Sequence, residues 1–225
     1  MQGSRLSATQ VEVLRALAGT IPRWRLIGGA ALAGFYTRHR ETRDLDLLWE
    51  GSDLELVGAQ VEQLLSRAGF KAEILHRAPA FRRYRLERGG EVVVLDLIAE
   101  PMPAIASPTE QLLGDDHILV DAPHEILVSK LTALLGRSEL RDLEDVRVLV
   151  QMGGDLARAL ADAPRKDAGF SPLTLAWLLR DFPVEALGAM LRRSPAELEQ
   201  LVRFRDELVG TIVAAAKPKG KGGEV

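Results

Sequence analysis

Apolar residues recur at helical spacing near the start of the chain, and the period then shortens to that of a strand. Val11, Leu14 and Leu17 lie three residues apart and predict an amphipathic helix over residues 7–19. The apolar run from Trp24 to Ile27 predicts a short strand directly after it. The first part of the chain is therefore expected to enter a sheet.

Two adjacent glycines, Gly28 and Gly29, end that first strand. Residues 30–36 after them look helical, so the pair predicts a tight strand-to-helix elbow. Residues 44–49 then alternate between polar and apolar positions at their start, as a strand with two different faces does. The order strand, elbow, helix, strand is expected over this segment.

A helix and a hairpin are predicted next. Asp53 is a plausible N-cap for a helix that runs to about Ala68. Strands over 81–87 and 91–98 flank Arg88-Gly89-Gly90, which is a hairpin signal. From about Pro123 onward the pattern is helical.

These elements predict an α+β fold, a mixed sheet flanked by helices and followed by a C-terminal helical bundle. The expected organisation is a first domain over residues 1–106, a helical domain over 107–216 and a disordered basic tail over 217–225. The last long helix has a clear start, because Ser194, Pro195 and Glu197 form a capping-box pattern.

Composition excludes several classes of protein. A 225-residue chain with 47% hydrophobic and 27% charged residues is typical of a globular protein. The absence of cysteine rules out disulfides, thiolate catalysis and cysteine-bound zinc. The net charge of -3 rules out a uniformly basic nucleic-acid coat, but it allows a local basic patch. No membrane span or secretory signal is visible, so a cytoplasmic protein without membrane partners is expected.

Asp44 and Asp46 are the first candidates for chemistry. On a strand, residues i and i+2 point to the same face with Cα atoms about 6.6 Å apart, so the two carboxylates can converge. Such a pair can hold divalent cations about 3.5–4 Å apart, the separation used in two-metal nucleotidyl transfer. The alternative is a pair of solvated aspartates at the start of a strand.

Asp96 is a further acidic residue within an apolar run, residues 92–98. Like charges among core strands are costly unless a cation balances them, and a bound metal removes that cost. A structural aspartate held by backbone donors is the alternative. Gly28 and Gly29 can let backbone N–H groups approach a triphosphate, although a plain tight turn has the same sequence.

A second charged cluster lies in the helical half. Lys130 sits within an apolar stretch and can extend its ammonium group toward phosphates, or it can be an ordinary lysine whose stem is buried. Arg141 and Asp145 have the i,i+4 spacing of a helix ion pair. For Asp142, a helix surface charge and a site acid are hard to separate.

A local basic surface is predicted around the hairpin. A patch of this kind can hold an RNA backbone, and a solvated strand face is the alternative. The arginines concerned, with Phe81 and Tyr84 between them, are Arg77, Arg82, Arg83, Arg85 and Arg88.

Together these residues resemble the AbiEii/AbiGii family of nucleotidyltransferase toxins, within the DNA polymerase β-like nucleotidyltransferase superfamily. The resemblance covers roughly residues 24–150. Its matching segments are Gly28 to Ala33, Arg40 to Asp46, Leu95 to Leu97, and the run of Lys, Arg, Arg-Asp and Asp from Lys130 to Asp145.

The resemblance implies a nucleotidyltransferase fold and Mg²⁺-dependent transfer of a nucleoside monophosphate from a nucleoside triphosphate (NTP). It places Asp44 and Asp46 on the metals, with Asp96 as a further ligand or as the base. It implies that Asp142 supports the nucleotide or the acceptor. The nucleotide-binding set that it implies is Gly28, Gly29, Thr42, Lys130 and Arg141.

The family also suggests an acceptor and a partner. An RNA, for example the 3′ end of tRNA, or a protein side chain is the expected acceptor, and a cognate antitoxin is the expected partner. Many members carry Ser or Thr after the glycines, whereas Ala30 has no hydroxyl. A nucleotide-binding or partner-binding module that has lost transfer is therefore one alternative, and a transferase acting on a small molecule such as an aminoglycoside is another.

Overall fold

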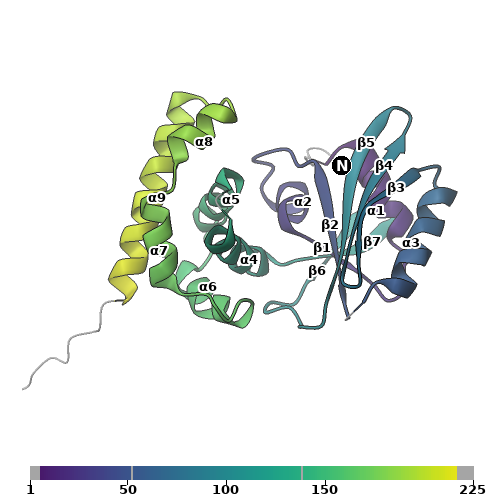
Figure 1. Cartoon of the computed structure of the whole chain (residues 1–225), viewed down its shortest axis with the longest axis horizontal. Coiled ribbons are helices and arrows are strands. Elements are labelled where there is room, and N and C mark those ends of the chain that lie inside the picture. The colour runs from purple at the N-terminus through teal and green to yellow at the C-terminus, as the bar shows by residue number, and fades with distance from the viewer. Residues whose placement is uncertain (1–5, 52, 138, 217–225) are drawn as a thin grey trace, which may run out of the picture. The chain divides into compact units, whose positions relative to one another are not determined.

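The computed structural model describes residues 6–51, 53–137 and 139–216, and the chain forms two compact units (Figure 1). The first unit ends at Ile126 and the second begins at Leu127. The predicted tail over 217–225 lies outside the described residues.

The first unit is built on a seven-stranded mixed sheet in the order β3-β4-β5-β2-β1-β7-β6. β2 runs parallel to β5 and β1 runs parallel to β7, whereas the other neighbouring pairs are antiparallel. The strands are β1 (Arg25–Ile27), β2 (Asp44–Glu50), β3 (Lys71–Ala78), β4 (Phe81–Arg88), β5 (Glu91–Glu100), β6 (Thr109–Leu113) and β7 (Asp116–Val120).

Helices cover this sheet in two different ways. α1 (Ala8–Leu17) and α3 (Glu55–Arg67) lie side by side on one face, and α2 (Gly28–Ala31) lies on the other (Figure 1). α2 continues into a single π-helical turn, Leu32–Tyr36. The alternation of β2 and β5 therefore buries leucines against α1 and α3 and leaves the opposite residues on the face where α2 begins.

The predicted start of α1 and the predicted hairpin are both confirmed. Ser7 Oγ accepts a hydrogen bond from Gln10 N at 3.1 Å, and Gln10 Oε1 accepts one from Ser7 N at 2.8 Å, which completes a capping box. Gly89 and Gly90 have φ values of 59° and 86°, as a two-residue hairpin turn requires at both positions.

The sheet contains three strands that the sequence pattern did not predict. Side chains along most of β3 are exposed, so this edge strand lacks a buried alternating face. β6 and β7 are five residues each, with polar residues on much of their surface. Because β7 pairs with β1, residues 109–120 belong to the first unit, and the division falls after residue 126 rather than after the predicted 106.

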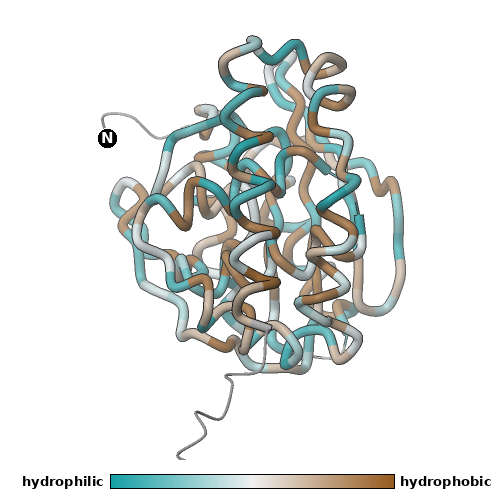
Figure 2. The backbone as a smooth tube through the Cα atoms, turned by 90° about the vertical axis from the view of Figure 1, so that its left-hand side faces the viewer, coloured by the Kyte–Doolittle hydropathy of each residue, from teal (hydrophilic) through white to brown (hydrophobic). Residues whose placement is uncertain are grey.

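The second unit consists of helices in the part of the chain that the structure describes. Figure 2 shows polar and apolar stretches alternating along these helices, and their apolar residues, such as Leu143, Leu175 and Leu201, are buried. The predicted capping box at Ser194 is confirmed, since Ser194 N donates to Glu197 Oε2 at 2.8 Å. The helices are α4 (Pro123–Gly136), α5 (Leu140–Gln151), α6 (Leu156–Asp162), α7 (Pro172–Arg180), α8 (Val184–Met190) and α9 (Pro195–Ala216).

No helix among the described residues is long and apolar enough to cross a membrane.

Candidate active site

The three predicted acids of the first unit lie on neighbouring strands. β2 and β5 run in parallel register with Asp46 directly opposite Asp96, and Asp44 lies two residues before Asp46 on the same face of β2. Neighbouring strands are about 4.8 Å apart, so residues in register can bring their side chains together. We call Asp44, Asp46 and Asp96 the acid face.

The glycine elbow adjoins the acid face. Ile27 is in register with Asp46, so the chain turns from β1 into α2 beside that carboxylate. Gly28 has φ +65°, and a Cβ atom at this position would lie 2.9 Å from Asp46 Oδ2. Both the backbone conformation and the space require glycine here. The predicted neighbourhood of elbow and acids is therefore present.

Two further residues of the segment before β2 lie close to this elbow. A Cβ on Gly29 would lie 2.6 Å from Arg40 Nη2, so the Arg40 guanidinium packs directly against the glycine backbone. Thr42 Oγ1 donates to the carbonyl of Asp44 at 3.2 Å and holds the first residue of β2. Arg40 belongs to the motif recognised in the sequence, but it was not predicted as a site residue.

Arg83 is the main site residue that sequence reasoning missed. Its Nε donates to Asp96 Oδ1 at 2.8 Å and its Nη2 donates to Asp96 Oδ2 at 2.6 Å. The hydrogen bond with Asp96 raises the pKa of Arg83, burial opposes this, and the charges of Asp96, Asp44 and Asp46 add to it. The acid face therefore acts on Arg83 as a group.

The position of Arg83 opposite Asp96 could have been predicted from the hairpin turn. A two-residue turn at Gly89-Gly90 pairs Arg88 with Glu91, and each step back along β4 then matches one step forward along β5. That count places Arg83 opposite Asp96, as observed.

Aromatic residues stand beside Arg83 on the same side of the sheet. The Arg83 guanidinium carbon lies 5.8 Å from the centroid of the Phe81 ring, and the Phe81 and His76 rings are 5.6 Å apart. Register aligns His76, Arg83, Asp96 and Asp46 in one row across four strands.

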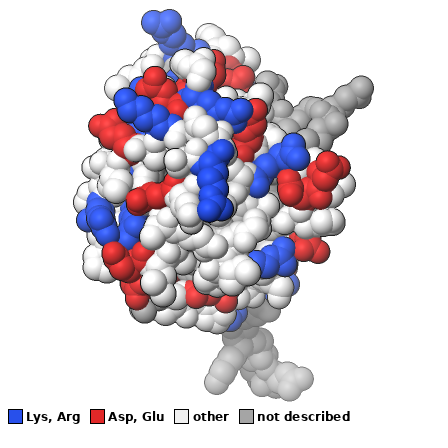
Figure 3. Space-filling view, turned by 90° about the vertical axis from the view of Figure 1, so that its right-hand side faces the viewer, with Lys and Arg blue, Asp and Glu red and all other residues white. Residues whose placement is uncertain are grey.

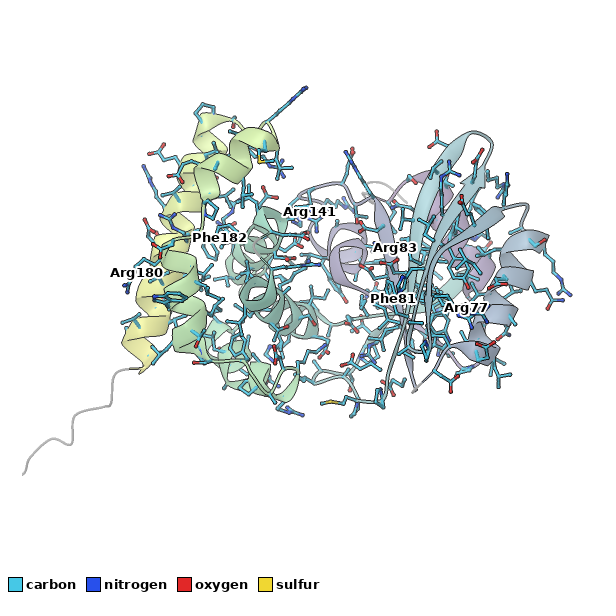
Figure 4. The ribbon with its side chains drawn as sticks, viewed as in Figure 1. Arg77, Phe81, Arg83, Arg141, Arg180 and Phe182 are labelled. Carbon is cyan, nitrogen blue, oxygen red and sulfur yellow. The ribbon has the colours of Figure 1, made fainter. Side chains whose placement is uncertain are left out.

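The other predicted arginines do not form a free basic patch, because each meets a carboxylate. Figure 3, which views the molecule from the right-hand side of Figure 1, shows cationic and acidic side chains interspersed over that surface. Figure 4 shows Arg83 beside Phe81, with Arg77 apart from them. The ion pairs are Arg77–Glu55 at 2.9 Å, Arg82–Glu55 at 2.8 Å, Arg85–Glu87 at 2.7 Å and Arg88–Glu12 at 3.1 Å.

The charged cluster of the second unit is almost fully buried. Lys130 Nζ lies 2.7 Å from Asp142 Oδ1 and 2.9 Å from Asp145 Oδ2, and it links α4 to α5. Arg137 Nε also donates to Asp142, at 2.9 Å. Lys130, Asp142 and Asp145 are 7%, 1% and 0% exposed. We call Lys130, Arg137, Asp142 and Asp145 the buried ion cluster.

The i,i+4 spacing of Arg141 and Asp145, considered as a helix ion pair, does not bring these two side chains together. Arg141 is about half exposed and donates to Glu139 at 3.2 Å, while Asp145 points inward to Lys130. The helix phase explains the difference: Asp142 and Asp145 lie on the buried side of α5, and Arg141 does not. The roles predicted for Lys130, Arg141 and Asp142 toward a nucleotide stay predictions.

The acid face fits Mg²⁺ in its donor chemistry, with one qualification about Asp96. Carboxylate oxygens are the ligands that Mg²⁺ prefers. Arg83 engages both oxygens of Asp96, and the described residues contain no group of three acids or histidines arranged to hold a metal ion. Asp44 and Asp46 therefore offer carboxylate oxygens of the kind that Mg²⁺ prefers, while Arg83 occupies both oxygens of Asp96.

The mixed sheet, the glycine elbow, the Asp-x-Asp strand and the third acid across from it are the arrangement that the resemblance to nucleotidyltransferases implies. The profile of the family described as "Nucleotidyl transferase AbiEii toxin, Type IV TA system" matches residues 12–216. The chain therefore belongs to the AbiEii family, which confirms the resemblance seen in the sequence and the assignment as a nucleotidyltransferase enzyme.

Solved structures agree on the fold. A candidate nucleotidyltransferase from Helicobacter pylori superposes with a TM-score of 0.55 at 17% identity, covering 94% of this chain and 100% of that one. JHP933 from Helicobacter pylori gives 0.52 at 19% identity, with 91% and 88% covered. An antigenic nucleotidyltransferase-like protein from Paracoccidioides brasiliensis gives 0.50 at 18% identity, with 76% and 94% covered. No curated protein matches the chain.

Proposed function

We propose that this nucleotidyltransferase toxin moves a nucleoside monophosphate from an NTP to an RNA, such as a tRNA 3′ end, or to a protein side chain, with Mg²⁺ as cofactor. One observation carries the proposal: Asp46 lies opposite Asp96 on a parallel strand, with Gly28 packed against the Asp46 carboxylate. The type IV toxin family further suggests a cognate antitoxin as partner.

In the proposed reaction, the acceptor hydroxyl oxygen forms a bond to the α-phosphorus of the NTP. The bond between the α-phosphorus and the pyrophosphate oxygen breaks, and pyrophosphate leaves with that electron pair. A carboxylate of the acid face, Asp96 in our proposal, takes the proton of the acceptor hydroxyl. Mg²⁺, when bound, supplies neutralisation of the charge that builds on the phosphates.

The residues of the chain have separate parts in this scheme. Asp44 and Asp46 hold the cation from one strand, and their spacing fixes the separation of the two carboxylates. The positive φ of Gly28 lets the backbone come close to the phosphates, and Gly29 allows the Arg40 guanidinium to approach them. Thr42 keeps Asp44 in place through its carbonyl.

The second unit contributes to the proposal through the family motif. Lys130 is proposed to act toward the triphosphate, with Arg141 beside it in the nucleotide-binding set, and Asp142 toward the nucleotide or the acceptor. Their contacts give a second interpretation, because the ammonium group of Lys130 is occupied by Asp142 and Asp145. Loss of activity in a Lys130 variant therefore needs a stability measurement beside it.

The test is transfer of label from each of the four NTPs with Mg²⁺ and total tRNA, a protein extract or an aminoglycoside as acceptor. Wild-type protein should label RNA or protein, and Asp44→Asn and Asp46→Asn should not. Asp115→Asn, an exposed turn acid of the same unit, is the matched control and should behave as wild type. Equal labelling by wild type and both site variants would contradict the proposal.

A nucleotide-binding module without transfer is the second candidate, and Ala30 favours it. The Ala30 side chain is fully buried and offers no hydroxyl beside the elbow. This candidate predicts that the NTP binds with Mg²⁺ while no acceptor is labelled. Equilibrium dialysis with labelled NTP, run beside the transfer assay, separates the two functions.

A further inference from the structure

The acid face creates an electrostatic cost that the protein must balance. Asp46 and Asp96 are in register on adjacent strands, and Asp44 adds a third carboxylate on the same side. Like charges at this separation repel, and burial of Asp96 strengthens the repulsion. A cation has to stand near these groups whether or not a metal is bound.

Arg83 supplies a cation at Asp96. Its guanidinium meets both oxygens of that carboxylate, at 2.8 and 2.6 Å, in the bidentate geometry that arginine forms best. The two partners differ in their access to solvent, since the Asp96 side chain is 5% exposed and the Arg83 side chain 45%. Asp96 is therefore fixed in the sheet, and Arg83 is the partner that can move.

In the position where it binds Asp96, the Arg83 guanidinium also lies near an aromatic ring. The Phe81 ring lies on the same strand and the same side of the sheet, with the guanidinium carbon 5.8 Å from its centroid (Figure 4). A guanidinium released from Asp96 can stay over this ring, where cation–π attraction and solvent both stabilise its charge. The guanidinium charge therefore remains stabilised when Arg83 leaves Asp96.

We propose that Arg83 is the counter-ion that a divalent cation replaces at Asp96, and that Arg83 thereby sets the affinity of the acid face for metal. Arg83 is in this sense a positioning residue, because it holds Asp96 in place and yields it when the cation arrives. This inference rests on the proposed function, because it takes the acid face as the metal site.

The experiment measures metal binding directly, in the full-length protein without nucleotide or acceptor. Free Mn²⁺ is followed by electron paramagnetic resonance during titration of wild type, Arg83→Gln, Arg83→Lys and Arg77→Gln. Removing the positive charge beside Asp96 should lower the Kd for Mn²⁺ by about tenfold. Arg83→Lys, which keeps the charge, should stay closer to wild type than Arg83→Gln.

Arg77→Gln is the matched control, because Arg77 is a half-exposed arginine of the same unit that pairs with Glu55 instead of the acid face. It should bind Mn²⁺ as wild type does. Circular dichroism melting checks that the variants fold. If Arg83→Gln does not fold, Mn²⁺ binding is compared between wild type and Arg83→Lys.

The outcomes distinguish failure of the inference about Arg83 from failure of the proposed function. If Mn²⁺ binds wild type, loses affinity in Asp44→Asn and is not bound more tightly by Arg83→Gln, the inference about Arg83 is overturned while the metal site stands. Tightening to the same extent in Arg77→Gln also overturns it, since the effect is then one of general charge. Absence of Asp44-dependent binding in every protein overturns the proposed function as well.

Discussion

The acid face and the buried ion cluster both place carboxylates beside basic side chains, but they differ in burial and in balance. In the buried ion cluster, Lys130 meets Asp142 and Asp145, and all three are almost excluded from water, whereas Arg137 reaches Asp142 from the surface with a side chain that is 55% exposed. On the acid face, Asp44 and Asp46 are only partly buried and lie next to Asp96.

The difference indicates what each set of charges does. Two buried carboxylates balanced by a buried ammonium group and a half-exposed guanidinium are satisfied internally, so the cluster fixes one helix against another and leaves little capacity for a ligand. Partly buried acids brought together on adjacent strands are poorly placed for stability alone, and they gain from an incoming cation. The first set therefore supports the structure, and the second is the site where chemistry is expected.

The largest expected effect is on the acid face. Asp46→Asn should lower nucleotidyl transfer by ~10³-fold, because it removes a carboxylate that neutralises the reacting phosphates through the cation. Its free energy of unfolding should stay equal or rise, since one like charge is lost. Steady-state transfer and urea unfolding on the same preparations check this, and a variant that loses activity and stability together would contradict the distinction.

The next effect is on the buried ion cluster and should be one of stability. Lys130→Met leaves Asp145 buried without its ammonium partner and should cost about 3–5 kcal/mol of unfolding free energy. Urea unfolding measures the loss. Arg141→Gln, at a half-exposed arginine on the outer side of the same helix α5, should change stability by less than about 0.5 kcal/mol.

If Lys130→Met instead folds as stably as wild type but loses NTP binding, the family-derived role of Lys130 is favoured over the structural one. Fluorescence-detected NTP binding on the folded fraction makes that decision.

A smaller effect is expected at the elbow that joins the scaffold to the acid face. Gly28→Ala imposes a positive φ on alanine and presses a methyl group toward Asp46 Oδ2, so it should cost about 1–2 kcal/mol of stability and reduce transfer by displacing that carboxylate. Gly19→Ala is the control, because a Cβ there meets nothing within 4 Å. Thermal melting and the transfer assay should change for Gly28→Ala alone.

Much of the acid face could be predicted from local sequence signals. The i,i+2 spacing of Asp44 and Asp46 fixes their common face, and the glycines mark the elbow because glycine adopts the left-handed backbone found at Gly28 at the lowest cost. That Asp96 lies beside them depends on the parallel pairing of β2 with β5, which local sequence does not encode. The position of Asp96 beside Asp44 and Asp46 was predicted from the order of the motifs, and the observed register places Asp96 opposite Asp46.

What could not be predicted shares a physical cause. β3 is an exposed edge strand, and β6 and β7 are short, so none shows the buried alternation that identifies strands. The partner of Lys130 was missed because the i,i+4 rule treats one helix at a time, whereas Asp145 pairs across two helices. Side-chain partners are set by packing between elements.

The smallest effect extends the comparison to the covered face of the sheet, where Tyr84 is buried beneath α3 and donates to Glu62 Oε1 at 2.8 Å. Burial, with the hydrogen bond and charge of Glu62, raises the pKa of Tyr84 to about 12, although Arg82 opposes the shift. A raised pKa in the folded state contributes stability that is full below the unfolded value of about 10 and is lost as pH rises toward 12.

The free energy of unfolding should therefore fall more steeply between these pH values in wild type than in Tyr84→Phe. Absorbance titration near 295 nm should show that the latest ionisation of wild type is lost in Tyr84→Phe; the comparison is needed because burial also raises the pKa of Tyr36, the one other tyrosine in the sequence. If Tyr84 ionises at its ordinary pKa, the covered face is open to water and does not differ from the acid face in the way proposed.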